Sequence, residues 1–217
     1  MTLNHALSTR SRKEAGVLLA EKLGRHRNSN GIVVAVSKGA AEVGYYLASE
    51  LRLPLEVVIC KEITHPGDTK KTIGSISADV VLLNEGTYDI PQDYIYHQIV
   101  LGQSAMRHQQ SFYNSNREAL NLKGKTIILV IDVLRSSDSL KATLQTIWNR
   151  RPREIKIAVA VASPAALQDL SDQVNEIQVL AVDANAKLER LYEDYVPLND
   201  EEIRNLISTS LSQFNLG

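Results

Sequence analysis

The chain has 217 residues but only one cysteine, and no apolar run is long enough to span a membrane. That one cysteine, Cys60, excludes an internal disulfide framework and fits the reducing cytoplasm, where we expect the protein to work. Cys60 ends an apolar run, so we expect it to pack as a small buried hydrophobe. No segment approaches the roughly 20 apolar residues of a transmembrane helix, and the N-terminus lacks the apolar stretch of a signal peptide. The sequence therefore predicts no membrane partner.

Several motifs of nucleotide and metal chemistry are also missing. There is no GxxxxGK[ST] phosphate loop, no GxGxxG dinucleotide fingerprint and no GxSxG nucleophile motif, so ATP hydrolysis, dinucleotide binding and serine hydrolysis have little support. The five histidines form no HxxxH or HxH pair and CxxC is absent, so no dedicated metal site is predicted. The net charge of −1 gives no electrostatic reason to expect nucleic acid as a partner.

Strand and helix patterns alternate along most of the chain. Short continuous apolar runs, which are typical of parallel strands covered on both faces, occupy 32–36, 55–59, 126–131, 155–162 and 177–182. Helical spacing of apolar residues occupies 10–23, 41–51, 94–112, 139–149, 164–174 and 200–214, and Asn199 or Asp200 is a suitable cap for the last helix. This alternation predicts an α/β fold with a mostly parallel sheet and helices on both faces.

Segment 64–118 departs from this rhythm. A turn at 65–68 precedes two short strands, at 72–77 and 80–83, and one long helix. We expect a cover, or hood, over the strand ends within a single domain that spans 1–217. The segment carries side chains that could stack on a base, hydrogen-bond it or hold an anion, although such residues more commonly face solvent or join the core. They are Tyr88, Tyr94, Tyr96, His97, Arg107, His108 and Arg117.

Two turns that follow predicted strands could carry chemistry. The first, after 32–36, consists of Ser37, Lys38, Gly39 and Ala40. A glycine there lets backbone N–H groups approach an anion, and a lysine supplies positive charge. The simpler alternative is a plain turn, in which Lys38 is solvated and Gly39 serves only to allow a positive φ.

The second turn lies in segment 126–140, where a buried-strand pattern ends in a carboxylate before a helix begins. Asp132 could accept hydrogen bonds from sugar hydroxyls, and the free N–H groups of the helix N-terminus favour phosphate. Arg135, Ser136, Ser137 and Ser139 could donate to phosphate oxygens. Alternatively, Ser136, Ser137 or Asp138 simply caps the helix, and Asp138 stabilises its first turn without any ligand.

The order and spacing of many short segments give the chain a recognisable pattern. These segments are 12–20, 33–39, 54–58, 66–67, 72–76, 81–84, 122–126, 157–162 and 191–195. In this pattern the chain resembles the type I phosphoribosyltransferases, and in particular a bacterial subgroup whose acceptor substrates are mostly unassigned. The resemblance implies a Rossmann-like sheet with a hood, which binds 5-phosphoribosyl-1-pyrophosphate (PRPP) at the carboxyl ends of the strands. It also implies a Mg²⁺ ion held largely by substrate oxygens, and homodimers are frequent in the family.

The PRPP motif of that family is only partly present. The family motif has two adjacent acids, a glycine, two variable residues, a threonine, a second glycine, a small residue and a threonine. Here the defined positions of the motif hold Ile131, Asp132, Val133, Ser136, Ser137, Asp138 and Ser139. The pyrophosphate loop of the subgroup commonly reads proline-arginine-glycine-glycine, and its counterpart is Ser37–Ala40, which keeps the charge and one glycine but loses the guanidinium fork.

These departures predict weak binding of PRPP. Asp138 would lie near a phosphate, and at ~5 Å with an effective dielectric near ~20 each unit of like charge costs about 3 kcal/mol. Arg135 could offset part of this cost, or Asp138 could replace the phosphate charge at the helix N-terminus. The resemblance implies a glycosyltransferase that moves phosphoribosyl from PRPP to an unassigned nitrogenous acceptor and releases pyrophosphate. The alternative is an inactive homologue, a pseudoenzyme, that serves as a binding or regulatory module.

Overall fold

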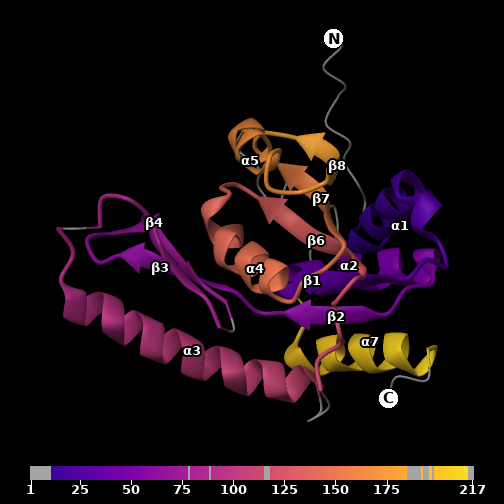
Figure 1. Ribbon diagram of the computed structural model, residues 1–217, viewed down its shortest axis with the longest axis horizontal. Coiled ribbons are helices and arrows are strands. Elements are labelled where there is room, and N and C mark those ends of the chain that lie inside the picture. The colour runs from indigo at the N-terminus through magenta and orange to yellow at the C-terminus, as the bar shows by residue number, and fades with distance from the viewer. Residues whose placement is uncertain are drawn as a thin grey trace.

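The computed structural model describes residues 11–214 except 78, 88, 115–117, 185–191, 193–195 and 197. Its elements follow the predicted alternation closely (Figure 1). In chain order they are α1 (Arg12–Lys22), η1 (Gly24–His26), β1 (Gly31–Val36), α2 (Lys38–Leu51), β2 (Leu55–Val58), β3 (Lys61–His65), β4 (Asp68–Ile76), β5 (Val81–Leu83), α3 (Gln92–Asn114), β6 (Thr126–Leu134), α4 (Asp138–Asn149), β7 (Glu154–Ala162), α5 (Pro164–Leu170), β8 (Glu176–Val182) and α7 (Asp200–Ser212). None of the described helices is long and apolar enough to cross a membrane.

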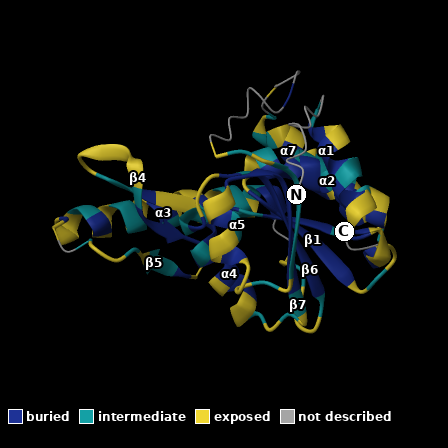
Figure 2. Cartoon of the chain, turned by 90° about the horizontal axis from the view of Figure 1, so that it is seen from above, coloured by how far each residue is buried: buried dark blue, intermediate teal, exposed yellow. Residues whose placement is uncertain are grey.

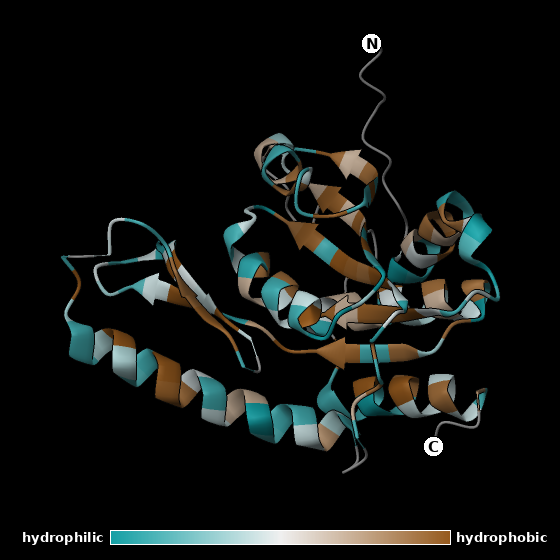
Figure 3. Cartoon of the chain, in the orientation of Figure 1, coloured by the Kyte–Doolittle hydropathy of each residue, from teal (hydrophilic) through white to brown (hydrophobic). Residues whose placement is uncertain are grey.

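The central sheet has five strands in the order β2-β1-β6-β7-β8, and every neighbouring pair is parallel. Apolar side chains on one face of the strands pack with α1, α2 and α7, and those on the other face pack with α4 and α5. Figure 2 shows the buried strands between these two helix layers, and Figure 3 shows the same strands as mainly hydrophobic. The predicted α/β class, with a mostly parallel sheet and helices on both faces, is therefore confirmed.

The strand order places a topological switch point between β1 and β6. From β1 the chain crosses through α2 to β2 on one side, whereas from β6 it crosses through α4 to β7 on the other side. Because the two crossovers run in opposite directions, a crevice opens beyond the carboxyl ends of β1 and β6.

An antiparallel sheet of β3, β4 and β5, with α3 packed on it, forms an arm beside the central sheet (Figure 1). The predicted excursion began at 64 and contained two strands, but β3 begins at Lys61. In this mostly polar strand only Ile63 is buried, which explains why the sequence pattern gave no strand there. The arm contacts the central domain through β4, where the Ser75 hydroxyl lies 3.4 Å from the amide of Ala142 in α4. The single-domain organisation and the covering role of this segment stay predictions.

Two boundaries differ from the sequence expectation. Strand β6 continues to Leu134 because its pairing with β7 runs on past Asp132, so Asp132 lies inside the strand rather than after it. Helix α5 ends already at Leu170. The expected cap of the last helix is confirmed: Asn199 accepts from the amide of Glu202, whose side chain accepts from the amide of Asn199, a capping box.

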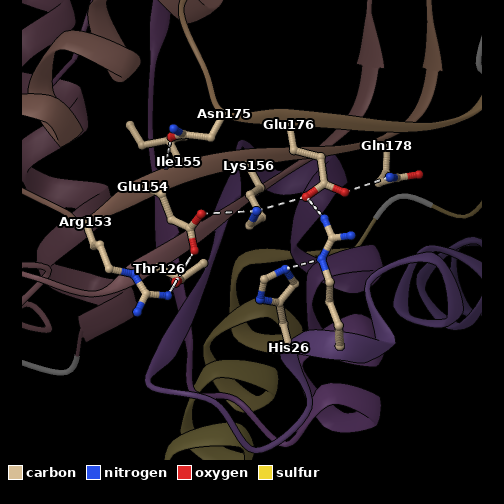
Figure 4. A network of polar contacts seen from close by, with 10 residues as sticks. His26, Thr126, Arg153, Glu154, Ile155, Lys156, Asn175, Glu176 and Gln178 are labelled. Carbon is tan, nitrogen blue, oxygen red and sulfur yellow. Dashed lines mark hydrogen bonds and ion pairs between the residues drawn. The ribbon is translucent and has the colours of Figure 1, made fainter.

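A buried charge cluster joins the amino ends of β6, β7 and β8 (Figure 4). Lys156, only 6% exposed, lies 3.2 Å from Glu154 and 2.9 Å from Glu176. Burial would raise the pKa of both carboxyls, but hydrogen bonds outweigh this effect and lower each pKa to about 2. Glu154 accepts hydrogen bonds from Thr126, Arg153 and Lys156. Glu176 accepts hydrogen bonds from Gln178, Lys156 and Arg25. Lys156 thus ties β7 to β8, and Glu154 connects both to Thr126 of β6; the strand pattern alone did not single out this lysine.

We expect Lys156→Met to destabilise the protein by about 1–3 kcal/mol at pH 7, because it leaves two partly buried carboxylates without their shared cation. The two glutamates titrate lower when folded than when unfolded, so their contribution is present above pH 4.5 and disappears as the pH falls toward 2. In the variant this loss should begin at higher pH. Urea unfolding between pH 3 and pH 7 measures both effects, with exposed Lys123→Met as the control. Equal stability of the two variants would contradict the role of Lys156.

Candidate functional site

The two loops singled out in the sequence meet at one edge of the sheet. Ser37–Ala40 follows β1, Arg135–Ser139 follows β6, and these strands are parallel neighbours. Both loops therefore flank the crevice at the topological switch point, where open α/β sheets bind their ligands. A Cβ placed on Gly39 would lie 3.1 Å from Oδ2 of Asp132, so the first loop packs against a side chain near the end of β6.

Asp132 is buried, with 4% of its surface exposed, and its carboxylate is held from both sides. Nε of Arg12, in α1, donates to Oδ2 at 3.0 Å, and the hydroxyl of Tyr192 donates to Oδ1. The guanidinium also lies against the Tyr192 ring, 5.4 Å from its centroid. The oxygen atoms predicted to accept from a ribose are thus already engaged by side chains of the chain itself; the ribose-binding role of Asp132 stays a prediction.

Charge and burial explain why these three side chains belong together. Burial raises the pKa of the Asp132 carboxyl, and Arg12 and the Tyr192 hydroxyl oppose that rise. Burial and the neighbouring carboxylate raise the pKa of Tyr192, so its hydroxyl remains a donor. Nη1 of Arg12 in turn donates to the carbonyl of Val196 at 3.2 Å and lies 4.0 Å from Glu42. One guanidinium therefore links α1, α2, β6 and the C-terminal part of the chain.

The backbone of the first loop, Ser37–Ala40, the counterpart of the family's pyrophosphate loop, is strained at Ser37. Ser37 has φ 83° and ψ 166°, a region that essentially only glycine visits without cost. Gly39 lies in the first turn of α2 without a positive φ, so the alternative that it serves only to allow a positive φ is wrong. Its lack of a Cβ instead leaves room for Asp132. The predicted anion ligand Lys38 pairs at 2.6 Å with Asp200 of α7.

In the second loop, Arg135–Ser139, the counterpart of the family's PRPP motif (the PRPP-like loop), the polar side chains form hydrogen bonds and ion pairs within the protein. The Ser136 hydroxyl accepts from the amide of Asp138 at 3.1 Å, so Ser136 satisfies one of the free N–H groups at the start of α4. The Ser137 hydroxyl is buried and donates to Asp169, and that of Ser139 donates to the carbonyl of Ser136. Asp138 forms an ion pair of 2.6 Å with Lys141. Lys141 thus partly compensates the negative charge of Asp138, and the sequence argument did not consider this partner.

Arg135, the cation expected to offset Asp138, has an exposed side chain, and its backbone carbonyl accepts from the Ser163 hydroxyl at 2.8 Å. The structure therefore fixes the backbone of Arg135 at the rim of the crevice. All the predicted loop residues lie at the switch point, whereas their phosphate contacts stay predictions.

An open hollow of about 700 Å³ lies next to the first loop, between α3 and α7. His108, Gln109 and Phe112 of α3 line it together with Asp200, the partner of Lys38. Asp200 also accepts a 2.5 Å hydrogen bond from Tyr113, and Lys38 and Tyr113 lower its pKa. A hollow of this size with an aromatic side chain and a few polar groups is suited to a small molecule.

The arm residues expected to meet a base have different surroundings. The Tyr94 hydroxyl donates to the carbonyl of Thr64 and belongs to the internal structure of the arm. Tyr96, His97 and Arg107 are exposed on α3, and His108 lines the hollow. Tyr88 and Arg117 lie outside the described residues, as does the matched segment 191–195 apart from Tyr192.

Sequence reasoning missed Arg12, Tyr192 and Asp200 as site residues. Arg12 and Asp132 are 120 positions apart, and Tyr192 lies a further 60 positions along the chain. Arg12 and Tyr192 both lie in segments that carry the family resemblance, which is the signal that could have drawn attention to them. No local pattern predicts that a residue of the first helix reaches the end of β6.

We expect Ser37→Gly to stabilise the protein by about 1–2 kcal/mol, because glycine adopts this backbone conformation without steric cost. Ser49→Gly, within α2, is the matched control and should instead destabilise it by about 0.5 kcal/mol. Denaturant unfolding of both variants measures the difference. If the two substitutions shift stability in the same direction, Ser37 is not strained.

Comparison with known proteins identifies the family of the chain. A model of the phosphoribosyl transferase domain matches residues 8–195. Two curated proteins from strains of Mycobacterium tuberculosis, each named "Putative phosphoribosyl transferase", are 20% identical over 200 residues. These matches cover 88% of this chain but 44% of the relatives, so the chain spans less than half of their length.

Solved structures share the fold of this chain. The crystal structure of TT1426 from Thermus thermophilus matches with a TM-score of 0.79 and 25% identity, over 94% of this chain and 99% of that one. AQ2163 from Aquifex aeolicus shares the fold, with a TM-score of 0.51 and 13% identity over 83% and 78% of the two chains. The resemblance predicted from the sequence is confirmed: since the family model covers both candidate loops and most of the sequence, the chain belongs to the phosphoribosyl transferase domain family.

Proposed function

We propose that the protein is a phosphoribosyltransferase that binds PRPP in the crevice between β1 and β6. The observation that carries this proposal is the meeting of the two loops at the switch point in a member of this family. In the reaction the bond from ribose C1 to pyrophosphate breaks, and a bond from C1 to a nitrogen of the acceptor forms. The work of such a site is mainly positional and electrostatic.

Each loop has groups suited to one end of the substrate. The N-terminus of α4, with the hydroxyls of Ser136 and Ser139, would hold the 5′-phosphate. The N-terminus of α2 and Lys38 would hold the pyrophosphate, provided that Lys38 leaves Asp200. Asp132 would accept from the ribose hydroxyls once the Tyr192 hydroxyl moves away.

Magnesium fits this scheme as an ion carried by the substrate. Among the described residues no group of three or more His, Cys, Asp or Glu side chains is arranged to hold a metal ion. Asp132 and Asp138, the carboxylates at the PRPP-like loop, are paired with Arg12 and Lys141. Mg²⁺ held by PRPP oxygens and water would neutralise charge on the pyrophosphate, and Lys38 would add to this effect.

The acceptor is proposed to bind in the hollow between α3 and α7. The Arg204 guanidinium lies over the Phe112 ring, 4.8 Å from its centroid, so a nitrogenous base would have to stack on the other ring face or displace Arg204. His108 and Gln109 offer hydrogen bonds at the base edge. Asp200 connects this hollow to Lys38, so the acceptor would lie next to the pyrophosphate-binding loop. We also propose that the protein works in the cytoplasm.

A homodimer is a further proposal, supported by the exposed apolar side chains of Tyr96, Val100 and Leu101 along α3. The mass of the particle in solution, from light scattering, decides this point. The mass of a single chain at micromolar concentration would overturn it.

A second candidate function is that of a binding or regulatory module without turnover. It is favoured by the internal partners of the two most important groups: Asp132 is bound by Arg12 and Tyr192, and Lys38 by Asp200. A ligand would have to compete with these contacts. Turnover in the unmodified protein would exclude this alternative.

We expect Mg²⁺–PRPP to bind weakly to the unmodified protein and about tenfold more tightly to Asp138→Asn. The substitution removes a negative charge at the phosphate position and releases Lys141 from its ion pair. Isothermal titration calorimetry measures both affinities, and exposed Asp172→Asn serves as the control. Absence of heat at millimolar Mg²⁺–PRPP in both proteins would rule out the transferase proposal.

We expect Tyr192→Phe to bind Mg²⁺–PRPP several-fold more tightly, because it frees Oδ1 of Asp132 for a ribose hydroxyl. The same change should cost about 1–2 kcal/mol of stability, since a buried hydrogen bond is lost. Calorimetry and urea unfolding give the two values. Tyr94→Phe, which removes a tyrosine hydrogen bond in the arm, is the control and should leave PRPP binding unchanged. If Tyr192→Phe also leaves it unchanged, Tyr192 does not compete with the ribose.

A further inference from the structure

A second, more enclosed cavity lies on the opposite face of the central sheet. It is bounded by β1, β2, the last turns of α3, the segment before β6, and α4, and its volume is about 50 Å³ when counted as space for the centres of water-sized spheres. A cavity of this size has room for ordered water or for a small single-ring molecule.

Each neighbouring element presents one regular face to this cavity. On α4 the lining residues Thr143, Thr146 and Ile147 have the spacing of a single helical face, and Arg150, directly after the helix, continues it. On α3, Gln110 and Asn114 are one turn apart. The sheet contributes Glu56, which pairs with Val34 on the neighbouring strand, so a charged residue stands within an otherwise apolar strand face.

The polar groups of the cavity are unusual for a protein interior. Thr143 and Thr146 are 1% and 6% exposed, and neither hydroxyl has a hydrogen-bond partner within the described part of the chain. The Thr143 hydroxyl lies close enough to the Cys60 thiol to lower the pKa of that thiol, although burial raises this pKa by more. The unpartnered hydroxyl of Thr146 is therefore the stronger indication of a bound molecule. A buried hydroxyl without a partner destabilises the folded protein, because it has lost its hydrogen bonds to water without replacement. Such groups are expected where a ligand or ordered water completes the bonding.

The remaining polar atoms define the chemistry of the occupant. The buried carboxylate of Glu56 accepts from the amide of Leu120, and Gln110 donates to the carbonyl of Val57 and to the side-chain oxygen of Asn114. The side-chain NH2 of Asn114 and the two threonine hydroxyls can therefore donate, and the hydroxyls can also accept. Glu56 and Arg150 balance in charge, and the other walls are largely apolar, with Ile59, Leu122 and Ile147 among them.

We propose that this cavity binds a small uncharged molecule that has both N–H donors and carbonyl acceptors, the chemistry of a single-ring heterocyclic amide. Ala119 is exposed and Gln110 and Arg150 are half-buried, so the occupant would enter between α3 and α4. The site is separate from the PRPP crevice, because Asp132 faces α1 across the sheet from α4. The proposal therefore does not depend on the phosphoribosyltransferase function.

The test uses uracil as the probe and ligand-observed NMR titration of the full chain. The unmodified protein should show saturable binding, and Thr146→Val should weaken it about tenfold or more, because the isosteric side chain removes the hydroxyl. Thr146→Ser keeps the hydroxyl and should bind within about threefold of the unmodified protein. Thr146→Val removes an unpartnered buried hydroxyl, so thermal unfolding should show a melting temperature that is not lowered.

Uracil that binds instead in the hollow beside Lys38 would give saturable binding that Thr146→Val leaves unchanged, and this result would overturn the proposal. Absence of saturable binding at millimolar uracil, or a crystal grown with uracil that shows only water in the cavity, would overturn it as well. Binding lost in Thr146→Val and kept in Thr146→Ser would support it.

Discussion

Burial of the Asp132 carboxylate is the constraint on which the candidate site depends. A charge at the end of a central parallel strand is stable only if a counter-charge and hydrogen-bond donors reach it. Arg12 comes from the first helix and Tyr192 from the far end of the chain, and both meet on this one side chain. Because Arg12 also donates to the carbonyl of Val196 and lies near Glu42, the same guanidinium connects α1 to α2 and to the backbone at Val196.

The same arrangement sets the balance between structure and ligand binding. Lys38 and Asp132, the groups best suited to a pyrophosphate and a ribose, both have partners that belong to the C-terminal part of the chain. A ligand at this switch point therefore exchanges one set of polar contacts for another, and its net affinity is the difference between the two. The ion pair of Asp138 with Lys141 also affects ligand affinity, because it reduces the repulsion between Asp138 and a bound phosphate without abolishing it.

The two ends of the sheet are organised differently. At the amino end, Lys156 is buried between Glu154 and Glu176, and the charges are neutralised within the protein. At the carboxyl end, Lys38 and Asp200 pair while roughly half of each side chain remains exposed, so water and ligands can compete for them. Buried pairs resist exchange and exposed pairs permit it. The amino end thus holds the strands together, whereas the carboxyl end combines the buried Arg12–Asp132 pair with the exposed Lys38–Asp200 pair, at which a ligand can compete.

The sequence by itself determined the alternation of strands and helices, because apolar runs and helical spacing report burial directly. It also located both loops, since each follows a buried strand, and it predicted a cap of the last helix at Asn199 or Asp200. It did not predict β3, whose polar residues leave only Ile63 buried, or the extension of β6 beyond Asp132, which depends on pairing with β7. The partners of Asp132 and Lys38 depend on tertiary structure, whereas Lys141 lies three residues after Asp138 in α4, a spacing that can be read from the sequence. Contacts between residues as distant as Arg12 and Asp132 arise from the packing of α1 on the sheet, for which the sequence holds no local pattern.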